Sequence, residues 1–296
     1  MANRHLLAAG TFLVSTSVLI QLNRKNRCFE YTCCDNHNVA SQVFGNSKVC
    51  IGTYAANNPC EDRNIYHEES GFQIAGVFDG HGGWNVSEYA SKTLIPKLLV
   101  KLNKSFLENS LDDSRTDIDT ISTFQDVEDS YIESVRASYI LGDGKVASVG
   151  SCVCLAIKKD DRLTIANCGD CRAVLGSNIY HGSTDSKGHK SKYVATRLSR
   201  DHNARIPLEL LNLQEQHPGE EDEVVRCHPN NPSACYVKGR LQLTRSLGDL
   251  YLKYGDFNAP AGQSKSMYTP DAVFSHIDSI YFLLFFKCAL SYLFSH

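Results

Sequence analysis

Two apolar runs joined by a short polar turn constrain the fold of this chain more than any other feature. Residues 151–157 and 162–166 have the length and apolar content of strands, and polar residues separate them. Such a short connection joins antiparallel neighbours, because parallel strands need a crossover of about a dozen residues or more. The two runs therefore predict a hairpin, and residues 171–176 predict a third strand after a turn at Gly169 and Asp170.

Other segments extend this pattern to an α+β fold. Further strand-length apolar runs lie at 49–54 and 71–78. Helical spacing of apolar residues occurs at 86–102, and again at 208–216, directly after a proline. Strands in hairpins with separate helices favour antiparallel sheets and argue against a parallel βαβ fold.

The composition narrows the class of protein. The chain has 296 residues, of which 42% are hydrophobic and 21% charged, as is typical of a globular protein. A net charge of -3 gives no basic excess, so we expect no nucleic-acid partner. The acidic stretch at 107–133 predicts a solvated loop that leads into a helix from about 126 to 141. Cys168 and Cys171 have CxxC spacing without a second such pair, so we interpret most of the 12 cysteines as reduced.

An uncharged apolar segment at 6–22 lies between Arg4 and a basic cluster at 24–27. A helix of this length would measure about 25 Å, slightly less than the roughly 30 Å core of a bilayer. We expect either a membrane anchor that leaves the following domain on the cytoplasmic side, or a mitochondrial presequence. A cleaved secretory signal is a third alternative. An aromatic-rich run at 280–294 is a second, shorter candidate membrane segment.

The segment from Phe78 to Trp84, with the sequence FDGHGGW, carries the clearest chemistry. Its glycines allow the backbone to turn sharply and to approach a ligand. Asp79 offers the oxygen ligands that Mg²⁺ or Mn²⁺ prefers, and His81 could donate a proton near neutral pH. The alternative is a glycine turn in which Asp79 caps the following helix.

Other blocks in the chain favour the functional interpretation of this segment. They are the Asn57-Asn-Pro-Cys-Glu-Asp-Arg63 block, with two adjacent carboxylates closing a strand, and the blocks at 150–152, 167–174, 198–203 and 243–249. In this order and spacing they resemble the metal-dependent PPM (PP2C-type) protein serine/threonine phosphatases, from about 49 to 272. The first block and the long segment at 201–218 look most like the mitochondrial pyruvate dehydrogenase phosphatase branch.

The resemblance implies an architecture as well as an activity. The expected fold is an α-β-β-α sandwich of two antiparallel sheets flanked by helices, C-terminally incomplete, in a monomeric domain at 28–278. An anchor or targeting segment at 1–27 would precede this domain, and a divergent apolar tail at 279–296 would follow it. The substrates would be proteins phosphorylated on serine or threonine.

The family's metal site maps onto individual residues of this chain. Asp79 would bridge two Mg²⁺ or Mn²⁺ ions, and the carbonyl of Gly80 would bind one of them. Glu61 and Asp62 would hold metal-bound waters. Asp170 falls where some members bind a third ion.

The same resemblance implies a mechanism. A metal-bridging hydroxide would attack the phosphorus in line, without a phosphoenzyme, and His81 would protonate the leaving serine or threonine oxygen. Many family members hold the substrate phosphate with an arginine, and Asn57 stands at that position, as in the pyruvate dehydrogenase branch. Asp249 and Arg245 are interpreted as a structural turn and an ion pair, and His202 as a packing or capping residue.

The chain departs from the family pattern after Asp271. Two later aspartate-containing blocks that supply metal carboxylates do not follow, so we expect weaker metal binding. Two interpretations remain: a shortened form of an active phosphatase, or a pseudophosphatase that binds phosphoproteins without turning them over. A membrane-tethered adaptor is a third alternative, which rests on the two apolar ends.

Overall fold

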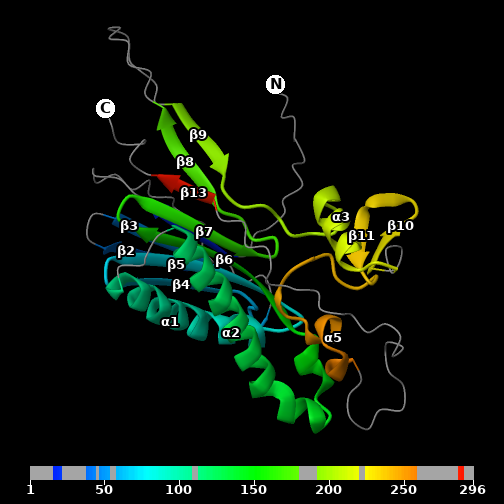
Figure 1. The fold of residues 1–296 in the computed structure, drawn as a ribbon. Coiled ribbons are helices and arrows are strands. Elements are labelled where there is room, and N and C mark those ends of the chain that lie inside the picture. The colour runs from blue at the N-terminus through cyan, green and yellow to red at the C-terminus, as the bar shows by residue number, and fades with distance from the viewer. Residues whose placement is uncertain are drawn as a thin grey trace, which may run out of the picture.

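The computed structural model describes residues 16–21, 38–44, 47–53, 58–108, 113–179, 192–219, 224–258 and 286–289. Within these residues a central sheet is covered by two long helices, and smaller sheets lie beside it (Figure 1). Every strand pairing among the described residues is antiparallel. The predicted α+β class with antiparallel sheets is therefore confirmed.

The central sheet has the strand order β13-β7-β6-β5-β4, and β12 pairs with the beginning of β6. Its strands are β4 (Arg63–Glu69), β5 (Phe72–His81), β6 (Gly150–Lys159), β7 (Arg162–Cys168), β12 (Leu247–Gly248) and β13 (Phe286–Ala289). The hairpin predicted from the sequence is β6–β7. The adjacent carboxylates of the first block precede β4 and do not close a strand, which corrects that expectation.

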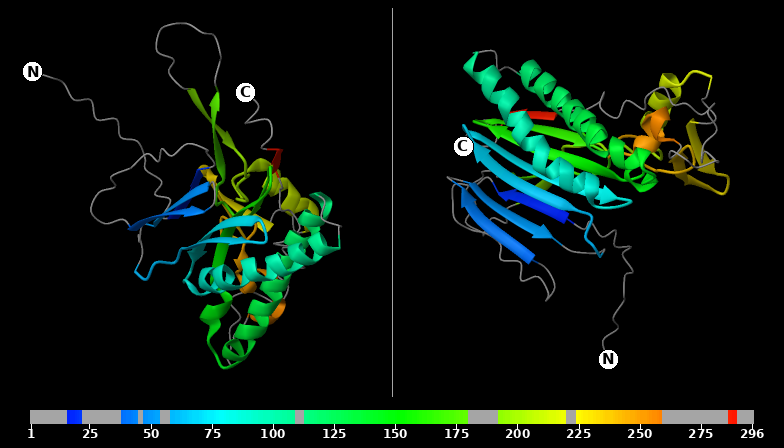
Figure 2. Two further views of the ribbon diagram at one scale, coloured as in Figure 1. Left: turned by 90° about the vertical axis from the view of Figure 1, so that its left-hand side faces the viewer. Right: turned by 90° about the horizontal axis from the view of Figure 1, so that it is seen from below.

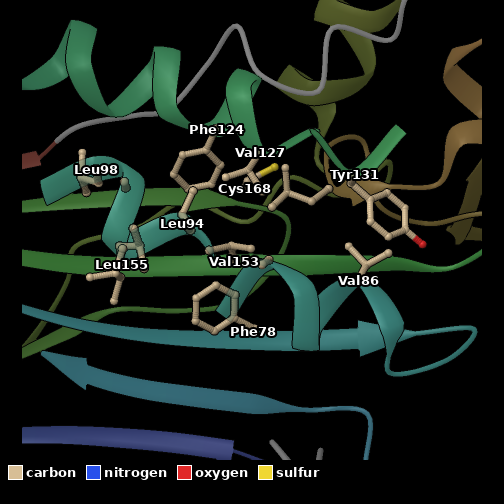
Figure 3. Packing of buried hydrophobic residues seen from close by; sticks show 14 of the residues in the cluster. Phe78, Val86, Leu94, Leu98, Phe124, Val127, Tyr131, Val153, Leu155 and Cys168 are labelled. Carbon is tan, nitrogen blue, oxygen red and sulfur yellow. The ribbon is translucent and has the colours of Figure 1, made fainter. Parts of the chain in front are cut away.

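Helices α1 (Asn85–Leu107) and α2 (Asp113–Ile140) pack together over one face of the central sheet (Figures 1 and 2). Apolar side chains from both helices meet those of β5 and β6 in the main core (Figure 3). The largest contributors include Phe78, Leu155, Leu94, Leu98 and Phe124. Each such side chain contributes about 1.5–3 kcal/mol when it is fully buried.

Helix α2 begins well before the expected start near 126, so most of the acidic stretch is helical and not a loop. Its acidic residues do not all face solvent. Asp119 is buried, where it accepts a 2.6 Å hydrogen bond from Ser105 of α1 and pairs with Arg115. Glu128 is buried against Lys253, far away in the sequence. The charge pattern alone predicts a solvated segment because Ser105 and Lys253, which contact these carboxylates, both lie outside the acidic stretch.

Among the described residues, three small sheets accompany the central one. Strand β3 (Ser47–Thr53) pairs with β1 (Thr16–Gln21) and β2 (Asn38–Phe44). The other two sheets pair β8 (Val174–Ile179) with β9 (Lys192–Arg197), and β10 (Val225–His228) with β11 (Asn231–Val237). The predicted third strand of the hairpin thus joins β9 and not β7.

The N-terminal apolar segment is not a continuous helix, because its residues 16–21 form strand β1 against β3. In the described ranges, no helix is both long and apolar enough to cross a membrane. The expected cellular location stays a prediction. Strand β13, within the apolar tail, pairs with β7 at the edge of the central sheet.

Short elements complete the described structure. They are η1 (Gly144–Ala147), α3 (Pro207–Gln216), α5 (Leu250–Lys253) and η2 (Gly255–Phe257). Helix α3 packs near β10 and β11, around a second cluster that includes Leu213 and Val237. A disulfide joins Cys227 and Cys235 across this hairpin, so these two cysteines depart from the expected reduced state.

Candidate functional site

The register of the central sheet brings the predicted site residues to one end. Asp79, near the end of β5, pairs with Cys152 near the beginning of β6. Asp170 follows the end of β7, which pairs with the same part of β6. Asp62 directly precedes β4, whose first residue pairs with Phe78. Three carboxylates that are far apart in sequence therefore converge.

The electrostatic environment of Asp79 reflects this convergence. Partial desolvation, followed by the nearby charges of Asp62 and Asp170, raises the pKa of Asp79 to about 6, although His81 acts in the opposite direction. Asp79 is exposed, so a ligand from solvent can reach the carboxylate. Like charges this close are the arrangement that a divalent cation would stabilise.

Gly80 and the Glu61 backbone pack directly against each other. A Cβ at Gly80 would collide with the carbonyl oxygen of Glu61 and with the Ser87 hydroxyl. That hydroxyl, from the first turn of α1, donates to the Glu61 carbonyl. Only glycine allows this contact, which places Glu61 beside the end of β5.

Arg63 fixes the segment that carries the two adjacent carboxylates. Its guanidinium donates to the carbonyls of Cys60 and Asp62 at 2.8 and 2.7 Å and pairs with Glu88 of α1. The guanidinium also lies 5.9 Å from the ring centre of Trp84. The backbone N-cap position of α1 is Trp84, so Asp79 does not cap that helix.

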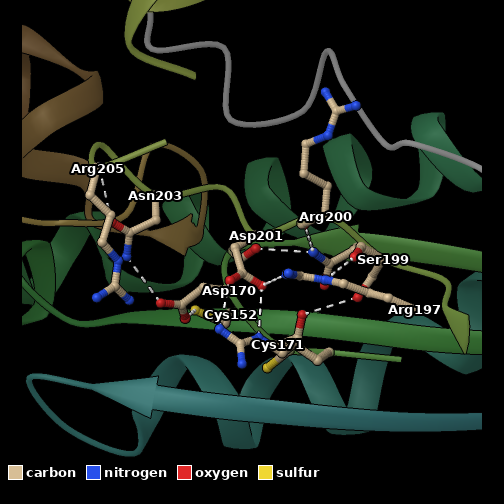
Figure 4. A network of polar contacts seen from close by, with 12 residues as sticks. Cys152, Asp170, Cys171, Arg197, Ser199, Arg200, Asp201, Asn203 and Arg205 are labelled. Atoms are coloured by element: carbon tan, nitrogen blue, oxygen red, sulfur yellow. Dashed lines mark hydrogen bonds and ion pairs between the residues drawn. The ribbon is translucent and has the colours of Figure 1, made fainter. Parts of the chain in front are cut away.

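Asp170 is held by contacts from two sides (Figure 4). Asn203 donates to its Oδ2 at 3.2 Å, and the Cys152 thiol donates to its Oδ1 at 3.5 Å. Nearby, Asp201 accepts a bidentate pair of hydrogen bonds from Arg172 and pairs with Arg197. Burial raises the pKa of Asp201, but the hydrogen bonds from the two arginines lower it by more than burial raises it. The pKa is therefore below its usual value, and this carboxylate is ionised.

His81, the last residue of β5, contacts a carboxylate that the sequence does not identify as its partner. Its Nε2 lies 2.8 Å from Oδ2 of Asp249. Burial lowers the pKa of His81, but Asp249, together with Asp79 and Asp170, outweighs that effect and raises it. The protonated ring is therefore favoured beside the carboxylates.

The chemistry of these groups suits a hard divalent cation, since they offer carboxylate and carbonyl oxygens. The described part of the chain nevertheless contains no group of three His, Cys, Asp or Glu side chains that could hold a metal ion by itself. Asp79, Asp62 and Asp170 would therefore be contributors to a cation site and not a complete ligand set. Asn57 lies outside the described residues.

Sequence reasoning missed several residues that support the site. Asn203 lies in the 198–203 block, but that block does not show that Asn203 contacts Asp170, and no local pattern marks Ser87 as a contact of Glu61. Arg245 forms an ion pair with Glu209 at 3.5 Å, whereas the sequence had suggested Asp249, in the same turn, as its partner. His202 is buried and packs as expected, where its Nδ1 accepts from the Gly169 backbone N–H at 3.2 Å.

Because His202 is buried, we expect the folded protein to lose stability in acid. Burial and the charges of Arg245 and Arg200 lower its pKa to about 3, against 6.5 in an unfolded chain. As the pH falls, His202 therefore binds a proton in the unfolded state at a higher pH than in the folded state. The stabilisation is complete above about pH 6.5 and is lost as the pH falls toward 3, by about 1.4 kcal/mol per pH unit from this group.

Urea unfolding of the wild type and His202→Asn between pH 7.5 and 5 measures this contribution. The variant keeps a hydrogen-bond acceptor but does not titrate, so we expect its free energy of unfolding to fall less steeply as the pH falls. Equal slopes for the two proteins would contradict the assignment.

Comparisons with known proteins identify the family of this chain. Residues 45–279 match the protein phosphatase 2C family. The chain is 31% identical over 215 residues to a probable protein phosphatase 2C 29 of Oryza sativa subsp. japonica, covering 73% of this chain and 52% of that protein. It is 33% identical over 216 residues to a probable protein phosphatase 2C 68 of Arabidopsis thaliana, covering 73% and 50%.

A solved structure is also similar, namely serine-threonine phosphatase 2C from Toxoplasma gondii. The TM-score is 0.49 at 17% identity, over 65% of this chain and 64% of that chain. The chain spans about half the length of the curated relatives described above. Those relatives are plant phosphatases, and they do not show the pyruvate dehydrogenase phosphatase branch. Because the family match covers most of the sequence, from residue 45 to 279, the chain belongs to the protein phosphatase 2C family.

Proposed function

We propose that this chain hydrolyses phosphoserine and phosphothreonine in proteins, with Mg²⁺ or Mn²⁺ as cofactor. The observation that carries this proposal is the convergence of Asp62, Asp79 and Asp170 with His81 at one end of the central sheet. Membership of the protein phosphatase 2C family supports the reaction class. Two cations, or three, would bind there.

Different residues of the chain would bind the cations and transfer the proton. Asp79 and the Gly80 carbonyl would hold the cations directly, Glu61 and Asp62 through water, and Asp170 would hold a further ion. When bound, Mg²⁺ or Mn²⁺ supplies Lewis-acid activation of water and of the phosphoryl oxygens.

The proton for the leaving group would come from His81. The leaving group is an aliphatic alkoxide, which needs a proton as its bond to phosphorus breaks. His81 lies among carboxylates that favour its protonated form, and its side chain is partly exposed. Its ring can therefore hold the proton and remain accessible to a substrate.

Finer features of the proposal rest on sequence resemblance. We infer a C-terminally incomplete sandwich of two antiparallel sheets with helices on both outer faces, in a monomeric domain. The Asn57 block and residues 201–218 support a substrate related to phosphorylated pyruvate dehydrogenase. A mitochondrial or membrane-associated location, with residues 6–22 as the signal, is the accompanying proposal.

Phosphate release by the full chain tests the function. With Mn²⁺ present, we expect release from a phosphothreonine peptide, no release after chelation with EDTA, and little release from a matched phosphotyrosine peptide. A folded chain that binds the phosphothreonine peptide but releases no phosphate would instead establish the pseudophosphatase alternative. Faster release from phosphorylated pyruvate dehydrogenase than from an unrelated phosphoprotein would support the substrate branch, and equal rates would contradict it.

A further inference from the structure

We propose that Asp249 is a positioning residue that holds the His81 ring in the orientation required for proton donation. This inference rests on the proposed phosphatase function. The sequence favours a structural turn at Asp249, but the contacts of its side chain indicate a more specific role.

The geometry of the pair is direct. Oδ2 of Asp249 lies 2.8 Å from Nε2 of His81, and the two residues are 168 positions apart in the chain. Asp249 is 2% exposed, whereas the His81 side chain is 25% exposed. With Nε2 directed to the buried carboxylate, Nδ1 is the ring nitrogen left for a reacting group. A carboxylate that fixes one ring nitrogen sets the tautomer and orientation of the other.

The backbone around the pair is adapted to this contact. Asp249 has φ 50° and ψ 40°, the left-handed region that a non-glycine residue seldom adopts. A Cβ at Gly150, which pairs with His81 across β5 and β6, would collide with both Asp249 Oδ2 and His81 Nε2. An unusual backbone conformation and an obligatory glycine at one contact are typical of functional geometry.

A second layer of contacts holds Asp249 itself. Ser246 donates its hydroxyl to Oδ2, the same oxygen that faces His81. The Asp249 backbone N–H donates to Val149 at 2.9 Å, next to Gly150. Lys253 then donates to the Ser246 carbonyl at 2.8 Å. The carboxylate is therefore fixed relative to the strand that pairs with His81.

A purely structural carboxylate in this turn would be expected to pair with the neighbouring Arg245. Instead, Arg245 pairs with Glu209, which also accepts a 2.9 Å hydrogen bond from Thr244. Glu209, in the first turn of α3, is 2% exposed, like Asp249. It is therefore a matched control: an equally buried carboxylate that contacts Arg245 and Thr244.

Nuclear magnetic resonance of the full chain tests the positioning directly. In ¹⁵N-labelled protein near neutral pH, long-range ¹H–¹⁵N correlations report which histidine nitrogens carry hydrogen, and His81→Gln assigns the His81 signals. Whether or not Nδ1 also carries a proton, we expect the wild type to show an Nε2 hydrogen held in a hydrogen bond by Asp249. We expect loss of that hydrogen-bonded signal in Asp249→Asn and its retention in Glu209→Gln. Unchanged His81 signals in a folded Asp249→Asn variant would overturn the proposal.

The dependence of kcat on the leaving group tests whether Asp249 assists proton donation by His81. A phosphothreonine peptide needs a proton on its leaving oxygen, whereas p-nitrophenyl phosphate releases a stable anion without one. We expect Asp249→Asn to lower kcat for the peptide about 10²-fold or more, and much less for p-nitrophenyl phosphate. Equal losses on both substrates would overturn the proposal. If the wild type hydrolyses neither substrate, the proposed function fails, while the resonance measurement still decides the role of Asp249.

Discussion

Replacing Glu128 by glutamine is expected to lower the free energy of unfolding by about 3–5 kcal/mol. Glu128 and Lys253 form an ion pair at 2.5 Å, with side chains only 1% and 3% exposed. The second carboxylate oxygen of Glu128 accepts a 2.9 Å hydrogen bond from the Gly248 backbone N–H. The variant leaves the Lys253 ammonium buried without its counter-charge, and a charge in that position is costly. Urea unfolding monitored by circular dichroism measures the loss.

Two further variants separate this effect from a general effect of the substitution. Glu133 lies on the same helix, with a side chain that is 75% exposed and 3.7 Å from Arg136. Glu133→Gln should change stability by less than about 1 kcal/mol, because exposed ion pairs contribute little. The double variant Glu128→Gln with Lys253→Met removes the unpaired charge and should recover part of the loss. A small effect of Glu128→Gln alone would contradict the importance of the pair.

Asp79→Asn is expected to have opposite effects on stability and on activity. Without metal, the variant should melt at a higher temperature than the wild type, because it removes a charge that Asp62 and Asp170 repel. With Mn²⁺, only the wild type should gain stability, since ligand binding to the folded state raises the melting temperature. Phosphate release should fall at least about 10²-fold, as expected when a group that stabilises transition-state charge is lost.

Melting curves with and without Mn²⁺, together with phosphate release, measure these effects. Asp161→Asn is the control, because Asp161 lies in the turn between β6 and β7, at the opposite end of the central sheet. It should leave the Mn²⁺ response and the activity unchanged. A wild type that is more stable than Asp79→Asn without metal would show that the carboxylates do not repel one another as described.

Local sequence patterns correctly predicted the helices and strands that are determined by residues close together in the chain. The apolar runs of β5, β6 and β7, the short polar turn of the β6–β7 hairpin and the helical spacing of α1 and α3 are all visible in the sequence. Strand β4 was missed because its residues Arg63–Glu69 are mostly polar and do not alternate. The first half of α2 was missed because its acidic residues look solvated until their partners are known.

Contacts between distant residues explain what the sequence could not predict. The blocks that carry Asp62, Asp79 and Asp170 are recognisable, but their convergence depends on the register of β4 to β7. Asp249 looks like part of a turn, since nothing near it in the sequence points to His81. The segment at 16–21 looks helical because its apolar residues are continuous, yet it pairs with β3.

Direct measurement of Mn²⁺ binding tests the central claim, that the carboxylates at the end of the central sheet form a divalent-cation site. Isothermal titration of Mn²⁺ into the full chain should show saturable binding that Asp79→Asn abolishes and that Asp161→Asn retains. Absence of binding to the folded wild type, or binding of equal affinity to Asp79→Asn, would contradict the claim.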